Sequence, residues 1–563
     1  MSTARLPRET FDPVSLGIMW DRLISITDEC VSALVRTSFS AIVRESYDLS
    51  VVLFAPNGSS LAQGTFSMPS FTGTAPTTIR HMLERFPPET LEPGDVILTN
   101  DPWLGTGHLF DVNVMRPVFR NSKLVAYTLS ITHLPDIGGR GFSATASQFY
   151  EEGLRIPICK LVRAGKLNED LIELIENNVR VSGQVIGDLK ANITCNEVGG
   201  RLLLQFMDEY GIDDLAPLSK AIISQTERAM REKIARIPDG IYRNEMPYEG
   251  PDGAIRLACT VEVKGDQVYV DFDGTDSAVD LAINVPFCYT SAFAAYSIKC
   301  VTIPGIPNNE GCIAPITVTA PKGCILNAQP PKATGARHVT GHMVNPLVFG
   351  ALADALPAEI QADCGSHDIL SFQGRDREGR DIANMYFAAS GFGALQDKDG
   401  ESATPAPANI TGTPSEVWEN LTGMTVIGRR LFPDSGGPGE HRGGLGQEVM
   451  LRNDTGYPMW ASFFAQWTDF PPRGKHGGGS GHVRRYWIND EQVNPRGRFL
   501  VQPGDVIRFV SAGGGGFGDP RKRDSKKLAA DIRDGYVTPE GALRDYGVAN
   551  AGSSTADQKV VTA

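Results

Sequence analysis

The run NDPWLGTGHLFDVNVMRPV at residues 100–118 is followed by KLVAYTLSITHLPDIGG at residues 123–139. Apolar and β-branched residues at 112–118 and 123–132 predict two strands. Each strand adjoins a glycine-containing loop in which a histidine is followed three residues later by an aspartate, as in His108 with Asp111 and His133 with Asp136. A strand end beside such a loop is a place where side chains can converge on a ligand without filling the core.

Two interpretations fit this pattern. Two imidazoles with one or two carboxylates form a mixed nitrogen and oxygen ligand set, which suits zinc, manganese or iron(II). The alternative is turn chemistry, because aspartate and histidine often cap loops. Spacing alone leaves both open. Asp48 opens a predicted strand at 47–54, where it is either a fourth ligand or an exposed strand end.

Outward from these strands, the chain mixes helices and strands without regular alternation. Asp12 followed by Pro13 is typical of a helix start, and the apolar spacing predicts a helix to about residue 44. We expect a short helix at 74–86 and mostly helix at 167–236. Alternating residues around Gly265 and Asp266 predict a hairpin, and helices are expected at 285–300 and 343–355.

The last third of the chain is dense in glycine. The sequence holds 60 glycines, crowded after residue 430, which indicates backbone positions that need positive φ or close approach. The expected fold class is α+β, multi-domain, with largely antiparallel sheet and a glycine-rich β C-terminal part. In chain order, we expect a metal-binding α+β domain at 1–240, a β-rich domain with helices at 241–425, a glycine-rich β domain at 426–523, a helical segment at 524–548 and a disordered tail at 549–563.

Composition excludes several classes of partner and location. With 53 basic and 66 acidic residues the formal charge is −13, which argues against nucleic acid or an anionic membrane surface as the main partner. No segment approaches the roughly 20 apolar residues of a membrane span, and the N-terminus lacks the apolar core of a signal peptide. Nine cysteines without a C-x-x-C pair favour a reducing cytoplasm.

Several catalytic motifs are missing from the sequence. There is no G-x-x-x-x-G-K-[ST], no H-E-x-x-H and no G-x-S-x-G, which weakens P-loop, metalloprotease and α/β-hydrolase interpretations. Residues 513–518 match G-x-G-x-x-G after a predicted strand. A proline follows at 520 and no helix begins at the loop, so we do not expect the isolated chain to bind ATP.

Six segments together resemble a known family. They lie at 44–48, 100–111, 133–139, 152–157, 434–444 and 514–520. In this order they are similar to the B-type subunit of the ATP-dependent hydantoinase/5-oxoprolinase family. That family includes N-methylhydantoinase, caprolactamase and the corresponding subunits of acetone and acetophenone carboxylases. The resemblance covers roughly residues 10–525.

The resemblance implies a metal and a partner. It implies one divalent ion, zinc, manganese or iron, with ligands that map onto His108, Asp111 and His133 and with Asp48 as the fourth. It also implies an A-type subunit that carries ATP and Mg on an actin-like fold, in an (αβ)2 hetero-oligomer in the cytoplasm. The missing phosphate-binding motif in this chain agrees with that division.

The implied activity is opening of a cyclic amide or imide, such as hydantoin, 5-oxoproline or a lactam, at the expense of ATP. The metal lowers the pKa of water and so supplies a nucleophile at neutral pH. Asp101 and Asp136 are candidate catalytic residues that orient the ligands or take a proton. The alternative activity is ATP-dependent carboxylation of a ketone of the acetone or acetophenone type. The length of 563 residues favours ring opening over carboxylation, because the resemblance implies a longer chain for the acetone carboxylase counterpart. A third hypothesis is a non-enzymic sugar- or peptide-binding module.

Overall fold

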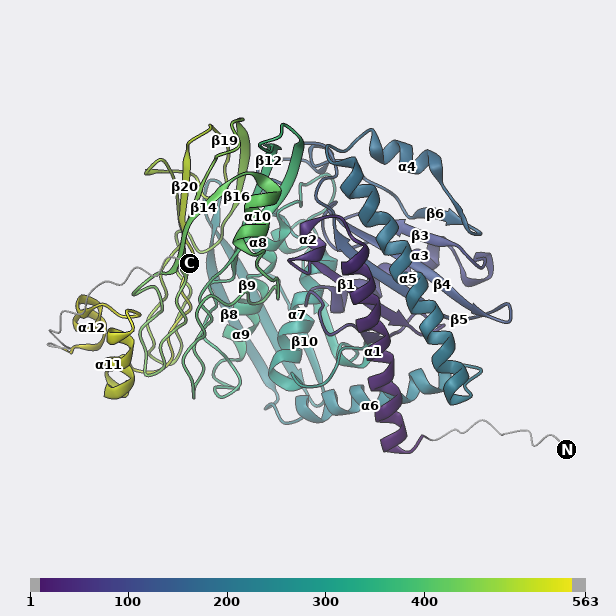
Figure 1. The fold of residues 1–563 in the computed structure, drawn as a ribbon. Coiled ribbons are helices and arrows are strands. Elements are labelled where there is room, and N and C mark those ends of the chain that lie inside the picture. Colours follow the sequence, from purple (N-terminus) through teal and green to yellow (C-terminus); the bar gives the residue numbers. More distant parts are fainter. Residues whose placement is uncertain (1–10, 549–563) are drawn as a thin grey trace.

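The structure is a computed structural model that describes residues 11–548 (Figure 1). The tail expected at 549–563 lies outside the described residues. Within residues 11–548 the strands form four sheets. Only one pair of named strands is parallel, β10 (Gln267–Asp271) with β11 (Ile316–Thr319). The prediction of an α+β fold with largely antiparallel sheet is confirmed.

The central sheet has seven strands in the order β2-β1-β5-β4-β3-β6-β7. The two strands predicted from residues 112–118 and 123–132 are its middle pair. The bounds are β1 (Leu49–Phe54), β2 (Ser60–Gln63), β3 (Val96–Thr99), β4 (Asp111–Arg120), β5 (Lys123–His133), β6 (Cys159–Arg163) and β7 (Lys166–Leu167).

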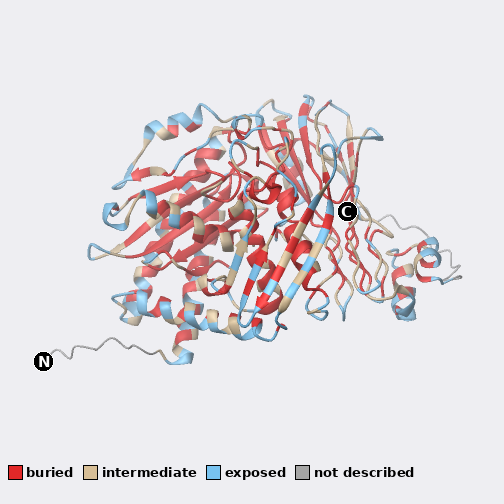
Figure 2. Cartoon of the chain, turned by 180° about the vertical axis from the view of Figure 1, so that it is seen from behind, coloured by how far each residue is buried: buried red, intermediate tan, exposed pale blue. Residues whose placement is uncertain are grey.

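Both faces of this sheet are covered. Val51 and Leu53 of β1 join an apolar cluster with α1 (Pro13–Thr37) and α5 (Ser182–Tyr210). Val52 and Phe54, on the opposite face, join the largest cluster of the molecule with α3 (Phe71–Arg85). The alternation follows from the two-residue period of a strand. All of β1 is therefore buried, and Figure 2 shows that buried residues predominate in the centre of the molecule.

The predicted N-terminal helix is shorter than expected. It ends at Thr37, and a separate turn of helix, α2 (Ala41–Arg44), follows. The carboxylate of Asp188 accepts hydrogen bonds from the backbone N–H groups of Phe39 and Ser40, at 2.7 and 3.2 Å. A long-range contact thus stabilises the break, which the local apolar spacing does not reveal.

A second sheet, in the order β11-β10-β9-β8, has one covered face. Residues of β8 (Gly240–Gly250) and β9 (Gly253–Lys264) alternate between buried and more exposed positions (Figure 2). The helix α9 (Val344–Leu352) packs on β8 and β9, and α7 (Phe287–Thr302) packs on α9 and α3. The predicted hairpin around residue 265 and both predicted helices are present.

The last two sheets face each other as a sandwich whose core also contains Trp418. One has the order β13-β12-β16-β19 and the other β14-β15-β20-β17-β18. The strand bounds are β12 (His367–Arg375), β13 (Asp381–Ala389), β14 (Thr425–Leu431), β15 (Gln447–Arg452), β16 (Met459–Phe464), β17 (Arg485–Ile488), β18 (Glu491–Gln492), β19 (Arg498–Val501) and β20 (Val506–Val510).

Glycine-rich segments pack backbone against backbone beside the sandwich. The N–H of Gly514 donates to Gly444 O at 3.0 Å, and Gly514 O accepts from the N–H of Gly437 at 2.8 Å. A Cβ on Gly514 would lie 2.1 Å from Phe392 O. Close approach of neighbouring backbones, rather than positive φ, is the requirement at this position.

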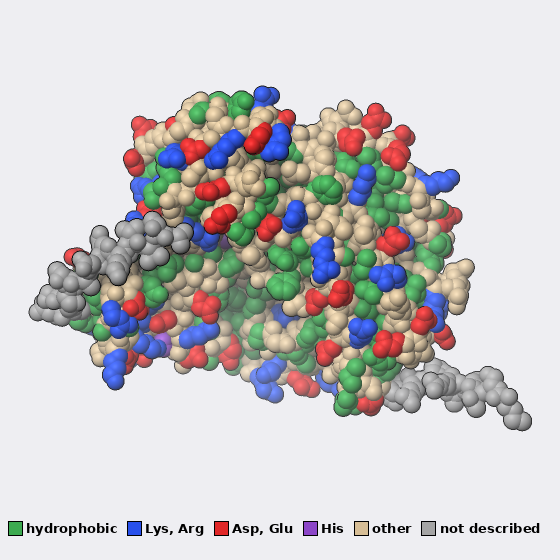
Figure 3. Space-filling model, viewed as in Figure 1, with side chains coloured by type: hydrophobic (Ala, Val, Ile, Leu, Met, Phe, Trp, Pro, Cys, Tyr) green, Lys and Arg blue, Asp and Glu red, His purple; other side chains and the backbone are tan. Residues whose placement is uncertain are grey.

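The remaining helices lie at the edges or join the sheets. Their bounds are α4 (Glu169–Glu176), α6 (Ala216–Ile234), α8 (Arg337–Gly341), α10 (Ser415–Thr422), α11 (Ser525–Arg533) and α12 (Pro539–Tyr546). Short 3-10 turns occur at Pro88–Thr90, Phe149–Glu151, Glu310–Cys312, Ile325–Asn327 and Pro520–Lys522. In residues 11–548 no helix combines the length and apolar character needed to cross a bilayer. Acidic and basic side chains are interspersed over the face shown in Figure 3.

Candidate metal centre

The central sheet positions the predicted ligands. Asp111 begins β4 and His133 ends β5, and the two residues are directly paired across the strands. Asp48 immediately precedes β1, and its carbonyl accepts the N–H of His133 at 3.2 Å. His108 lies in the glycine-containing loop before β4. Adjacent strand ends thus bring together residues from three parts of the sequence.

Three of these side chains form a compact set. Nε2 of His108 lies 2.9 Å from Oδ1 of Asp111, and the imidazole centroids of His108 and His133 are 5.0 Å apart. One ligand atom from each of the three residues lies within 4.8 Å of the others, and all three residues are buried. Neighbouring ligand atoms on one divalent ion stand about 3 Å apart when each bond is about 2.1 Å.

The free atoms of this set all lack a hydrogen-bond partner. They are Nε2 of His108, Oδ1 of Asp111 and Nε2 of His133. The other ring nitrogens are engaged: Nδ1 of His108 donates to Gly335 O at 3.0 Å, and Nδ1 of His133 donates to Leu134 O at 2.9 Å. A carbonyl only accepts, so each Nε2 carries a lone pair, as metal-binding histidines do. The residues therefore fit a divalent cation.

Arg337 orients the aspartate. Its Nη2 donates to Oδ2 of Asp111 at 2.6 Å, and its Nε donates to Thr106 O in the loop before His108, also at 2.6 Å. Burial opposes ionisation of Asp111, but the neighbouring His108 and the guanidinium of Arg337 outweigh it and lower the pKa of the carboxyl. Asp111 is therefore ionised while one of its oxygens remains free.

Burial keeps both imidazoles of the set neutral. It lowers the pKa of His133 to about 3, helped by the nearby His108, and it lowers the pKa of His108 as well. Neutral imidazole is the form that binds a metal. Asp48 lines the same cavity, but its carboxylate is not part of the compact set. Burial and the charge of Asp111 raise the pKa of Asp48 to about 8. Its role as a fourth ligand stays a prediction.

Asp101 and Asp136 do not line this cavity. Oδ2 of Asp101 accepts from Nε of Arg155 at 2.6 Å, while its Oδ1 accepts from the N–H of Trp103 at 2.9 Å. Asp136 accepts two hydrogen bonds of 2.6 Å from Arg180, one from the guanidinium and one from the backbone N–H. Both aspartates hold the loops that carry the histidines. Their role at the site, orienting the ligands or taking a proton, stays a prediction.

Sequence reasoning missed a second group of side chains at the same cavity. His338, His342 and His367 line it together with Tyr289 and Arg337. Five of the nine histidines in the chain therefore meet at one place. The four-residue spacing of His338 and His342 was a visible signal, because it places both on one face of a helix. Nothing in the local sequence connects them with residues 108–133.

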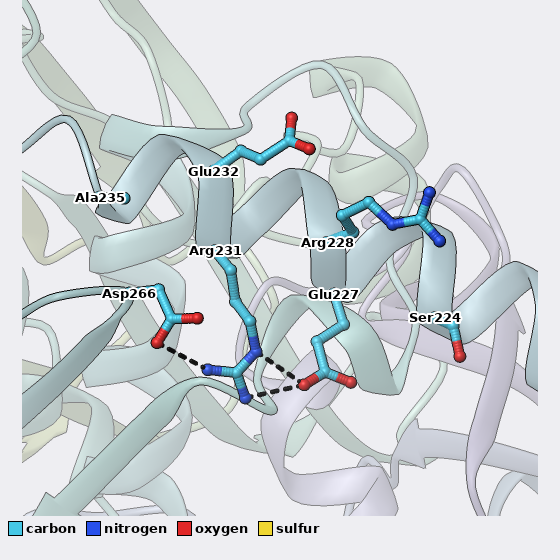
Figure 4. A pocket seen from close by; sticks show the side chains of 7 residues that line it. All are labelled: Ser224, Glu227, Arg228, Arg231, Glu232, Ala235 and Asp266. Carbon is cyan, nitrogen blue, oxygen red and sulfur yellow. Dashed lines mark hydrogen bonds and ion pairs between the residues drawn. The ribbon is translucent and has the colours of Figure 1, made fainter.

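The cavity at the histidines is small, and two other hollows differ from it in character. Its volume is about 30 Å³, enough for an ion or a water molecule. A larger cavity of about 230 Å³ shares His342 with it. A third hollow, of about 420 Å³, lies at the surface along α6. Figure 4 shows Arg231 there, reaching between Glu227 and Asp266, so one guanidinium pairs with both carboxylates.

Known proteins with the same organisation identify the family. Residues 12–520 match the hydantoinase B/oxoprolinase family. The chain is 30% identical over 587 residues to the putative B-type subunit of a D-/L-hydantoinase from Pseudomonas sp. (strain NS671), covering 99% of this chain and 98% of that protein. It is similar to the crystal structure of the ATP-dependent caprolactamase from Pseudomonas jessenii, with a TM-score of 0.90, 28% identity and 98% of both chains covered.

A nucleotide-free structure of acetone carboxylase shares the fold, with a TM-score of 0.84 over 95% of this chain and 79% of that chain. The identity of 20% limits that likeness to the fold. The resemblance found in the six sequence segments is thus confirmed over nearly the whole length. The chain belongs to the hydantoinase B/oxoprolinase family.

Proposed function

We propose that this chain is the metal-binding subunit of an ATP-dependent amidohydrolase that opens a cyclic amide or imide. The partner is an A-type subunit that carries the ATP site. Two relatives support this proposal: one is a putative hydantoinase subunit of the B type and the other is an ATP-dependent caprolactamase. Hydantoins and caprolactam are both cyclic amides.

One observation carries the proposal. Three buried atoms, Nε2 of His108, Oδ1 of Asp111 and Nε2 of His133, have no hydrogen-bond partner, and one ligand atom of each residue lies within 4.8 Å of the others. Burying a polar atom without a partner costs about 1–3 kcal/mol, so such a set persists where a ligand satisfies it. The two neutral imidazoles and the ionised carboxylate suit zinc, manganese or iron.

A divalent cation supplies Lewis-acid chemistry when bound, because it polarises a carbonyl oxygen and lowers the pKa of water. The protein's own residues hold and orient the candidate ligands of that cation. Arg337 fixes Asp111 and the loop at Thr106, while Asp101 and Asp136 hold the loops that carry the two histidines. The three candidate ligands are buried in the resulting site.

His338 and His367 are candidates to bind the reacting group across the cavity. Nε2 of His338 and both ring nitrogens of His367 are buried without a partner. Burial lowers the pKa of both residues, so each is neutral and offers one N–H donor. Such donors can stabilise charge that develops on a carbonyl oxygen during ring opening.

The test uses the complex of the chain with its A-type subunit. One series supplies ATP with hydantoin, 5-oxoproline or a lactam. The other supplies ATP with a ketone and labelled bicarbonate. We expect ring opening coupled to ATP hydrolysis, and about one divalent metal ion per chain by elemental analysis.

Two results would contradict the proposal. Incorporation of label into a β-keto acid, with no cyclic amide opened, would assign the complex to ketone carboxylation instead. Micromolar binding of ATP to the isolated chain by calorimetry would contradict the division of labour between the subunits.

A further inference from the structure

The larger cavity lies directly beside the site of the three unpartnered ligand atoms. It has a volume of about 230 Å³ and is formed by α7, α9 and the segments at 359–366 and 392–407. His342 lines both this cavity and the small one. Ser366, on the larger side, is hydrogen-bonded to Nδ1 of His342 at 3.1 Å. One side chain, His342, thus lines both a space of molecular size and the cavity of the candidate metal site.

The wall of this larger cavity, which we call the α7–α9 cavity, is mainly apolar. Its apolar and aromatic side chains include Tyr296, Val301, Met343, Phe349, Phe392 and Leu395. No lysine or arginine belongs to its lining. Its two acidic residues are Glu359, which is exposed, and Asp363, whose Oδ2 accepts from Nε of Arg473 at 2.6 Å.

Two buried acceptors in the wall lack a partner. They are Oδ1 of Asn345 and Oδ1 of Asp363. Nζ of Lys475 lies 3.9 Å from Oδ1 of Asp363, which is too long for a hydrogen bond. A ligand that brings an N–H group would satisfy either acceptor. Apolar walls with a few polar groups that fix orientation are typical of small-molecule sites.

We propose that the α7–α9 cavity binds the ring of a neutral cyclic amide and places its reacting bond next to His342. The inference rests on the proposed function. It adds the place where the substrate ring binds and a preference for neutral rings over charged ones. The ring packs on the apolar wall, and its amide N–H donates to Asn345 or Asp363. A ring that carries a carboxylate, such as 5-oxoproline, is disfavoured because a buried anion needs a cation or several donors.

Binding without turnover tests the location. The full, metal-loaded chain is dialysed against radiolabelled hydantoin, ε-caprolactam and 5-oxoproline in the absence of ATP. We expect each neutral ring to bind at least about tenfold tighter than 5-oxoproline. Val301→Phe, which narrows the cavity, is expected to weaken binding of the neutral rings at least about tenfold, since pocket volume discriminates on this scale.

A matched control and two further variants distinguish a loss of binding from a loss of folding. Ala235→Phe adds an aromatic ring to the surface hollow along α6 and should leave binding unchanged (Figure 4). If Val301→Phe does not fold, Val301→Ile should still weaken binding about threefold. Phe349→Ala widens the cavity and should raise affinity for caprolactam relative to hydantoin at least about tenfold.

The outcomes separate the two proposals. Equal or tighter binding of 5-oxoproline, failure of all three rings to bind, or unchanged affinity in the folded Val301→Phe chain would each overturn the cavity assignment. Binding that follows the expected order, in a chain whose complex opens no ring, would retain the cavity assignment and contradict the proposed amidohydrolase function.

Discussion

The histidine-lined cavity and the glycine-rich segments are both buried, and they treat their polar atoms in opposite ways. Around Gly514 the backbone N–H and C=O groups donate to and accept from one another in neighbouring segments. Around His108 several side-chain nitrogens and oxygens have no partner. The first arrangement is complete by itself, whereas the second is complete only with a ligand.

Mutations in the two regions should therefore impair different properties of the protein. Mutations among the glycine segments act on packing, because the backbones leave no room for a side chain. Mutations of the unpartnered side chains in the histidine-lined cavity act on ligand binding, because no other group of the protein depends on their free nitrogens and oxygens. Substitutions in the two regions test that separation.

Replacement of a predicted ligand should have the largest effect. His108→Ala removes one of the three facing atoms, so the metal content should fall from about one per chain to near zero. Ring opening by the complex should fall on the order of a thousandfold, while ATP turnover by the partner is partly retained. Elemental analysis and product assays measure both. His81→Ala, at a partly exposed residue paired with Glu84, is the control. Full metal content in His108→Ala would remove the assignment.

A side chain in the glycine segments should destabilise the fold instead. Gly514→Ala places a methyl group 2.1 Å from Phe392 O, a backbone atom that cannot move aside alone. We expect a loss of about 3 kcal/mol in unfolding free energy, or an insoluble chain. Gly17→Ala, in α1 with no atom within 4 Å of the added methyl group, should stabilise by up to about 1 kcal/mol. Equal melting temperatures for both variants would contradict the packing argument.

Arg337→Lys should have an intermediate effect on metal binding, because it keeps the positive charge and loses the forked N–H donors of the guanidinium. Lysine cannot donate to both Asp111 and Thr106 as the guanidinium does. We expect metal affinity to fall about 10- to 100-fold, as for other residues that orient a ligand. Competition with a metal-sensitive dye measures the affinity. Arg231→Lys, in the surface hollow of α6, is the matched control. Unchanged affinity would show that Arg337 serves packing only.

The sequence was sufficient where the signal is local. The strands at 112–118 and 123–132, the hairpin around residue 265 and the helices after 285 and 343 were predicted from alternation, turn residues and apolar spacing. The local pattern marked His108, Asp111 and His133 only as candidates, and the family resemblance mapped the ligand set onto them. The structure brings the three together because the two predicted strands are neighbours.

Prediction failed where the cause lies far away in the chain. The break after Thr37 depends on Asp188, about 150 residues later, and no local pattern reports it. His338 and His367 meet His108 only because α8 and the start of β12 line the same cavity as the loop before β4. Backbone packing of the glycine segments likewise depends on which segments are neighbours, whereas composition indicated only that close approach was needed.

The smallest expected effect concerns two adjacent carboxylates with opposite environments. Burial raises the pKa of Glu152 to about 8, although Oε1 accepts from the N–H groups of Thr334 and Gly335. Hydrogen bonds from Ser147 lower the pKa of Glu151 to about 2. Since the folded pKa of Glu152 lies above its ordinary value of 4.5, its contribution is complete below pH 4.5 and is lost as pH rises towards 8. The maximum slope is about 1.4 kcal/mol per pH unit.

Glu152→Gln keeps an acceptor for the two N–H groups and cannot ionise. We therefore expect the variant to gain stability relative to the parent chain as pH rises from 5 to 8, whatever its stability at pH 5. Glu151→Gln is the neighbouring control: Glu151 is ionised in both folded and unfolded chains over that range, so the variant should keep the parent's pH dependence. Melting temperatures of all three chains at each pH measure the difference. A Glu152→Gln curve parallel to the parent's would mean that this buried carboxylate is ionised in the folded chain. The N–H groups of Thr334 and Gly335 would then stabilise its charge, and the carbonyl of the same Gly335 accepts from Nδ1 of His108.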